Sequence, residues 1–109
     1  MFAELTDFMR KKLDSVDLSE RAFERELKYK RGALHNVFLG RAPPRLQDLG
    51  RMAKVLKLNA GDSLRLRELA LRAHEYNDLA DELIALHQRQ DKMEKRIAQL
   101  EKLVAESGR

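Results

Sequence analysis

The central segment of the chain, residues 18–58, reads LSERAFERELKYKRGALHNVFLGRAPPRLQDLGRMAKVLKL. Apolar side chains recur in it at the three- and four-residue spacing of an amphipathic helix. The spacing predicts helices over about 19–27 and 31–39, with the inward residues Ala22, Phe23, Leu27, Leu34, Val37 and Phe38. Gly40 and Pro43-Pro44 end the second of these helices. A third follows them, with an apolar stripe formed by Leu46, Leu49, Met52, Ala53 and Leu56.

Helices are also expected on both sides of this segment. Residues 2–13 carry one apolar face, and Asp17 or Ser19 can cap the helix that follows the next turn. After residue 58, Asn59 or Asp62 can cap a helix that extends to about residue 73. Two prolines and five glycines in 109 residues favour an all-α fold. We therefore predict a five-helix domain over residues 1–74.

Composition excludes several functional classes. The chain has no cysteine, so a disulfide framework and a thiolate metal site are excluded. No apolar run approaches the roughly 20 residues that span a bilayer, so we expect a cytoplasmic protein without membrane contact. No catalytic constellation stands out, and His74 with Asp78 lacks a third metal ligand. We expect no catalytic residues, no metal, no cofactor and no small-molecule ligand.

Positive charge is concentrated in the middle of the chain. Residues 21–57 hold ten basic and three acidic side chains, a net charge of +7, whereas the whole chain carries +4. Such a basic middle between near-neutral flanks indicates a localised anionic partner.

The chain after residue 74 follows a heptad pattern, typical of a coiled coil over residues 75–106. Its a and d positions are Tyr76, Leu79, Leu83, Leu86, Gln90, Met93, Ile97, Leu100 and Val104. A lone helix would expose this seam to water, so we expect a partner helix. A fold-back onto the chain's own domain is the alternative.

The charges beside the seam predict the orientation of that partner. In a parallel pair of identical helices, each g position faces an e position of the second helix. The facing pairs are then Arg89 with Glu94, Arg96 with Glu101, and Glu82 with His87. An antiparallel in-register pair sets like charges together, so the pattern favours a parallel homodimer. A trimer or tetramer remains open, as does continuity of the last helix through Asn77-Asp78.

Residues 18–58 resemble the lambda-repressor-like helix-turn-helix family of bacterial and phage regulators. The resemblance lies in two short helices followed by Gly40-Arg41, a proline, and a helix that ends in Lys-Val-Leu-Lys-Leu. With the flanking helices it covers about residues 1–73. The chain has Glu24 where the family usually has a small residue, and Lys28 where it usually has a glycine. Lys28 would need a left-handed backbone or a longer turn.

The resemblance implies that the helix of residues 31–39 enters the DNA major groove with its N-terminal half against the bases. The implied base contacts are Lys30, Arg31, Gly32, Ala33, His35 and Asn36. Arg31 can donate two hydrogen bonds to guanine, and Asn36 can pair with adenine. The implied phosphate contacts are Ser19, Arg21, Arg25, Lys28, Arg41 and Arg45.

These expectations combine into a homodimeric, sequence-specific transcriptional regulator, most simply a repressor that binds double-stranded DNA at an inverted repeat. The coiled coil would join two DNA-binding domains. The alternative is a coiled-coil interaction module, antitoxin-like or a replication-associated adaptor, with secondary DNA binding. Sequence-indifferent DNA packing is a third reading. The operator and the controlled genes are not encoded in any pattern of the chain.

Overall fold

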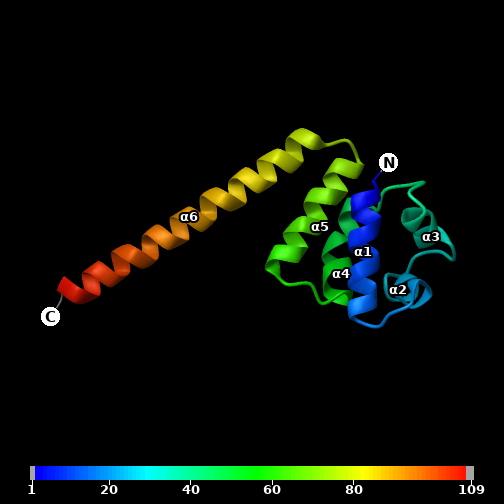
Figure 1. Cartoon of the computed structure of the whole chain (residues 1–109), viewed down its shortest axis with the longest axis horizontal. Coiled ribbons are helices and arrows are strands. Elements are labelled where there is room, and N and C mark those ends of the chain that lie inside the picture. The colour runs from blue at the N-terminus through cyan, green and yellow to red at the C-terminus, as the bar shows by residue number, and fades with distance from the viewer. Residues whose placement is uncertain (1, 108–109) are drawn as a thin grey trace.

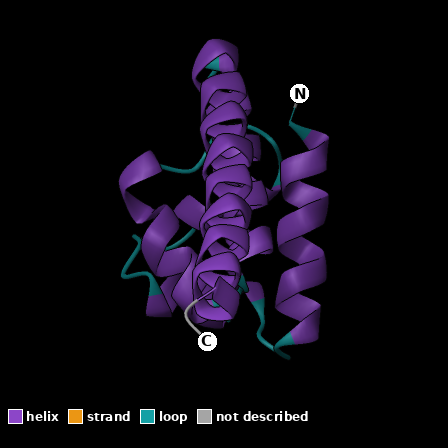
Figure 2. Ribbon diagram, turned by 90° about the vertical axis from the view of Figure 1, so that its left-hand side faces the viewer, coloured by secondary structure: helices purple, strands orange, loops and turns teal. Residues whose placement is uncertain are grey.

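The computed structural model describes residues 2–107, and these form helices joined by short loops with no strand among them (Figures 1 and 2). The elements are α1 (Ala3–Ser15), α2 (Glu20–Glu26), α3 (Ala33–Phe38), the 3₁₀ turn η1 (Leu46–Asp48), α4 (Leu49–Val55), α5 (Ala60–Ala73) and α6 (Asn77–Ser107). The expected all-α class is confirmed. Met1, with which the predicted domain begins, lies outside the described residues. No helix within residues 2–107 combines the length and apolar character needed to cross a membrane.

Helices α1 to α5 gather around one apolar core at one end of the molecule (Figure 1). Phe23 from α2 meets Phe38 from α3 edge to face, with ring centroids 6.5 Å apart. Burial of one such side chain stabilises a fold by about 1.5–3 kcal/mol. The buried core residues are Leu5, Met9, Leu13, Phe23, Leu27, Leu34, Val37, Phe38, Leu49, Met52, Leu56, Leu66, Leu69 and Ala70.

Three of the predicted inward residues are not fully buried. Ala22 and Ala53 are half-buried, with Ala53 packed against the core, and Leu46 is exposed. Leu46 does not belong to α4, because the chain after Pro44 first forms η1 and enters α4 only at Leu49. The apolar stripe of the sequence therefore begins one turn later than predicted.

Helices α1 to α5 all end in the same hydrogen-bond pattern. At the end of α2, Lys28 N–H donates to the carbonyl of Arg25 and Tyr29 N–H donates to that of Glu24, both at 3.1 Å. This paired bonding is the Schellman motif, and it needs one residue in the left-handed region. Glycine fills that position only after α3. The left-handed residues of the five ends are Asp17, Lys28, Gly40, Lys57 and Glu75.

The start of α3 differs from the expected helix over 31–39. Helix α3 begins at Ala33, so Lys30, Arg31 and Gly32 lie in the turn before it. Gly32 adopts φ +85° at the helix N-cap, a conformation that glycine takes without steric cost. The first three predicted base contacts are therefore turn residues and not helix residues.

Side-chain caps set two of the helix starts. The Ser19 hydroxyl accepts a hydrogen bond from Ala22 N–H at 3.1 Å, and the Asn59 side chain accepts one from Asp62 N–H at 2.8 Å. Of the alternative caps considered for each helix, Ser19 and Asn59 are the ones used.

The chain reverses between α5 and α6. His74 to Tyr76 form the connection, with Glu75 at φ +63°, and α6 then runs unbroken from Asn77 to Ser107. Its first turns pack on α5, where Ala80 is fully buried and Leu83 and Ile84 are half-buried. Beyond them α6 diverges from the domain (Figure 1), and the molecule is 63 Å long.

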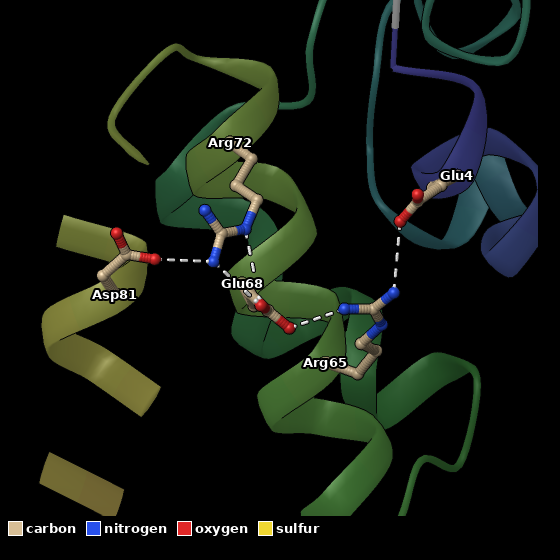
Figure 3. A network of polar contacts seen from close by, with 5 residues as sticks. All are labelled: Glu4, Arg65, Glu68, Arg72 and Asp81. Carbon is tan, nitrogen blue, oxygen red and sulfur yellow. Dashed lines mark hydrogen bonds and ion pairs between the residues drawn. The ribbon is translucent and has the colours of Figure 1, made fainter. Parts of the chain in front are cut away.

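A chain of ion pairs crosses α1, α5 and α6 (Figure 3). Arg65 donates to Glu4 of α1 at 3.2 Å and to Glu68 at 2.7 Å. Arg72 donates to the same Glu68 carboxylate at 3.1 Å and to Asp81 of α6 at 2.9 Å. Burial by itself raises the pKa of the Glu68 carboxyl, but the hydrogen bonds from Arg65 and Arg72 outweigh it and hold that pKa below its ordinary value. Two of the arginines of α5, Arg65 and Arg72, are thus neutralised by carboxylates of the chain itself.

Candidate nucleic-acid interface

The connection between α2 and α3 presents three exposed basic residues in four positions. Lys28 lies in the left-handed region at φ +58°. The turn requires this backbone conformation, which is uncommon for a residue other than glycine. Lys30 and Arg31 follow Lys28 and are also exposed. Half-buried Tyr29 anchors the turn, because its hydroxyl donates to the buried carboxylate of Asp48 at 2.6 Å. A fixed turn thus holds these cations at one edge of the domain.

Glu24 fixes the start of α3 from within the domain. Its side chain is buried, with 8% of its surface exposed. Its two carboxylate oxygens accept hydrogen bonds from Gly32 N–H at 3.0 and 3.1 Å, and Oε2 also accepts one from Leu34 N–H at 3.1 Å. These donors are among those that the first turn of a helix leaves without partners. Glu24 therefore takes the place of an N-cap side chain for α3.

Sequence reasoning missed this role of Glu24. From the sequence, Glu24 is only a departure from the small residue of the lambda-repressor-like pattern that the segment resembles. The sequence does hold a signal for this role. Glu24 follows the inward residue Phe23, and Gly32, at the start of the next helix, has no side chain with which to cap it. A buried carboxylate needs hydrogen-bond donors, and the nearest unsatisfied donors in the chain are those of the following helix.

The candidate base contacts divide into free and engaged groups. Lys30, Arg31 and Asn36 are exposed, and no ion pair or side-chain hydrogen bond involves them within residues 2–107. His35 is exposed but its Nδ1 lies 3.0 Å from Glu20 Oε1, so Nε2 is the ring nitrogen left for a second contact. Gly32 has no side chain to offer a base and forms the N-cap of α3. Ala33 is half-buried and faces a pocket beside α3.

The candidate phosphate contacts also differ among themselves. Arg21, Arg25, Lys28 and Arg41 are exposed and form no ion pair with any described residue. Arg45 instead donates from Nε to Asp48 at 2.8 Å, and its guanidinium carbon lies 4.9 Å above the Tyr29 ring. The hydroxyl of Ser19 is used as the helix cap. Arg45 and Ser19 thus already have structural partners.

Tyr29, Asp48 and Arg45 form one hydrogen-bonded group. Both donors meet the same oxygen, Asp48 Oδ2. Burial, and then the hydrogen bond to Asp48, raise the pKa of Tyr29 to about 12. The hydrogen bond to Asp48 also raises the pKa of Arg45. At neutral pH the phenol is therefore a neutral donor, and Arg45 balances the charge of Asp48.

The basic side chains of residues 21–57 are almost all without an acidic partner in the described chain. Nine of the ten basic side chains in this range make no ion pair within residues 2–107, and all nine are exposed. They are Arg21, Arg25, Lys28, Lys30, Arg31, Arg41, Arg51, Lys54 and Lys57. Unneutralised, solvent-facing positive charge of this density attracts polyanions.

The heptad seam of α6 is exposed over most of its length. Every described residue from Ala85 to Ser107 is exposed, and the large apolar seam residues from Leu86 onward keep 45–69% of their surface accessible. A fold-back of this part onto the domain is therefore absent. At the other end Tyr76 precedes α6 and stacks on His74 with ring centroids 6.0 Å apart, and Leu83 is half-buried on α5. Tyr76, the first predicted a position, thus lies one residue before the helix begins.

No known protein family matches this chain, and neither the curated proteins nor the solved structures contain a significant match to it.

Proposed function

We propose that the chain is a homodimeric, sequence-specific DNA-binding transcriptional regulator, a repressor of the lambda-repressor-like helix-turn-helix kind. The observation that carries the proposal is the set of nine exposed basic residues without an ion pair among the described residues, six of them in α2, in the α2–α3 turn or directly after α3, and three on α4 or at its end. In this reading α2, the turn and α3 are the helix-turn-helix, and α1, α4 and α5 complete its domain.

We assign base recognition to the α2–α3 turn and the first turn of α3. Arg31 and Asn36 are exposed and unengaged, and they can make bidentate contacts to guanine and adenine respectively. Glu24 supports this role indirectly, because its bonds to Gly32 and Leu34 hold the turn and the helix in one position. Preorganised side chains lose less conformational entropy on binding. Four other exposed cations, Arg21, Arg25, Lys28 and Arg41, are assigned to phosphates.

Self-association is assigned to the α6 seam from Leu86 to Val104. Exposed apolar side chains at heptad spacing, flanked by complementary Arg89, Glu94, Arg96 and Glu101, favour a parallel pair of identical helices. A two-fold pair carries two DNA-binding domains, so the operator is expected to be an inverted repeat. Binding of the second domain then becomes intramolecular and raises affinity without a new contact.

The same exposed seam also supports a second candidate, an interaction module whose coil binds a different protein. The charge pattern discriminates between the two, since a self-complementary e and g arrangement favours a second copy of the chain. Sedimentation of the purified protein decides it: a dimer supports the first candidate, whereas a monomer supports the second.

The decisive experiment is selection of ligands for the full-length protein from randomised duplex DNA. We expect one enriched motif with two inverted halves. Affinity is then compared on the selected duplex and on a scrambled one. Arg31→Ala or Asn36→Ala is expected to cost about 1–3 kcal/mol on the selected duplex and much less on the scrambled one.

The matched control is Lys92→Gln, which removes an exposed positive charge on α6, away from α2 and α3. It should change both affinities little. Failure to enrich any motif, or equal losses on both duplexes for Arg31→Ala and Asn36→Ala, contradicts sequence-specific readout and leaves sequence-indifferent DNA packing as the alternative.

A further inference from the structure

We propose that a pocket beside α3 binds a small amphipathic monoanion, a molecule with a flat or aliphatic apolar body and one carboxylate or sulfonate group. The pocket is an open cleft of about 370 Å³ between the α2–α3 turn, α3 and the segment of residues 42–45. This volume falls within the range of small-molecule sites. The proposal goes beyond DNA binding and stands on its own.

The walls of the pocket are apolar. Ala33 and Val37 lie one helical turn apart on α3 and face the segment of Ala42, Pro43 and Pro44 across the cavity. None of these five side chains carries a polar atom. Small-molecule sites are mostly apolar, with a few polar groups that fix orientation. The walls therefore suit the apolar body of a ligand.

Hydrogen bonds and buried side chains hold two sides of the pocket in place. Pro44 is fully buried, and its carbonyl accepts a hydrogen bond from His74 Nε2 at 2.6 Å. On the opposite side, Tyr29 is tied to Asp48 and covered by the Arg45 guanidinium. Two proline rings limit the backbone of residues 43–44. A preformed site binds with a smaller entropic cost.

The rim carries positive charge that no described residue neutralises. Lys28, Lys30 and Arg45 line the pocket. Asp48 balances Arg45, whereas Lys28 and Lys30 form no ion pair within residues 2–107. The net charge facing a ligand is thus positive, and the chemistry that complements apolar walls with a cationic rim is an apolar anion. Because Lys28 and Lys30 are also candidate DNA contacts, we expect bound ligand and bound DNA to compete.

The test uses ¹⁵N-labelled full-length protein without DNA, so its result does not depend on the proposed function. Naphthalene-2-carboxylate is the probe. Its neutral amide and inorganic phosphate are the two comparison ligands. We expect amide shifts at Ala33, Val37 and Ala42 with the carboxylate, and at least tenfold weaker binding of either comparison ligand.

Two variants separate pocket binding from general attraction. Lys28→Asn combined with Lys30→Gln removes the rim charges, and asparagine tolerates the left-handed backbone at Lys28. We expect roughly fivefold to tenfold weaker binding of the probe. Lys57→Asn is the matched control, since Lys57 is also exposed, unpaired within the described residues and left-handed at φ +54°. It should bind the probe like the parent chain.

A third variant, Ala42→Leu, fills the mouth of the pocket at an exposed position. It should abolish the shifts while leaving the melting temperature unchanged. The proposal is overturned if phosphate or the amide binds as tightly as the carboxylate, if the shifts lie on the α6 seam instead, or if the Lys28 and Lys57 variants weaken binding equally.

Discussion

Oε2 of Glu24 lies 3.1 Å from the amide nitrogen of Leu34 and accepts its hydrogen bond, joining the buried face of α2 to the first turn of α3. The same carboxylate holds Gly32 N–H. No buried side-chain polar atom among the described residues lacks a partner, and Glu24 meets that condition through backbone groups alone. One side chain thereby fixes the element that we assign to base readout.

Glu24→Gln is expected to destabilise the domain by about 1–3 kcal/mol, because its NH₂ group would face the N–H of Gly32 in place of one carboxylate oxygen, and the remaining neutral amide oxygen is a weaker acceptor than a carboxylate. Urea unfolding followed by circular dichroism at 222 nm measures the difference. Glu26→Gln on the same helix is the control, since Glu26 is exposed and its change should stay within about 0.5 kcal/mol. Equal losses in the two variants would refute the capping role.

Glu68 is expected to make stability depend on acid pH. Its pKa is lowered in the folded state, so its contribution is present above the unfolded pKa and is lost as the pH falls through the folded value. Between about pH 5 and pH 3 the melting temperature of Glu68→Gln should therefore fall less than that of the parent. Asp7→Asn, an exposed carboxylate change on α1, should follow the parent curve. Parallel curves for all three proteins would show that the network in Figure 3 contributes nothing.

Lys57→Gly is expected to be neutral or to stabilise the domain by up to about 1 kcal/mol. Glycine relieves the left-handed strain at the end of α4, but it loses more conformational entropy on folding than lysine does. Lys54→Gly, inside α4, should instead cost about 1 kcal/mol. Thermal unfolding of the two variants distinguishes the sites. A loss at Lys57 as large as that at Lys54 would contradict the helix-end assignment.

Charge reversal tests the parallel coil. Arg89→Glu with Arg96→Glu sets like charges across a parallel pair and should weaken self-association. A partner chain with Glu94→Arg and Glu101→Arg should restore it in a mixed dimer, since each facing pair regains opposite charges. Analytical ultracentrifugation of the separate and mixed proteins measures this. Absence of rescue in the mixture argues against the parallel register.

Local patterns in the sequence predicted the helices and most of the core. Phe23, Leu27, Leu34, Val37 and Phe38 are all buried as their spacing indicated. Such spacing is reliable because neighbours three and four residues apart share one helix face. The predicted helix starts were too early. Helix α3 begins at Ala33 and α4 at Leu49, because turn hydrogen bonds there compete with helical ones.

The sequence predicted which residues make up the candidate interface, but not the contacts that hold them in place. The exposed cations follow from the charge count, and Lys28 adopts the left-handed backbone that its position in the turn requires. The partners of Glu24, Arg45 and His74 could not be read from the chain. Each lies three to thirty residues away, and whether two such groups meet depends on how the turns direct the helices.

The sequence by itself determined the helical class, the basic middle and the apolar seam, because each is a property of residues close together along the chain. Only the tertiary structure decided that α6 leaves the domain after packing Ala80 on α5, that Glu24 caps α3, and that a pocket forms beside it. These features arise where segments distant in sequence pack together, and long-range packing is a balance of burial and chain entropy over the whole fold.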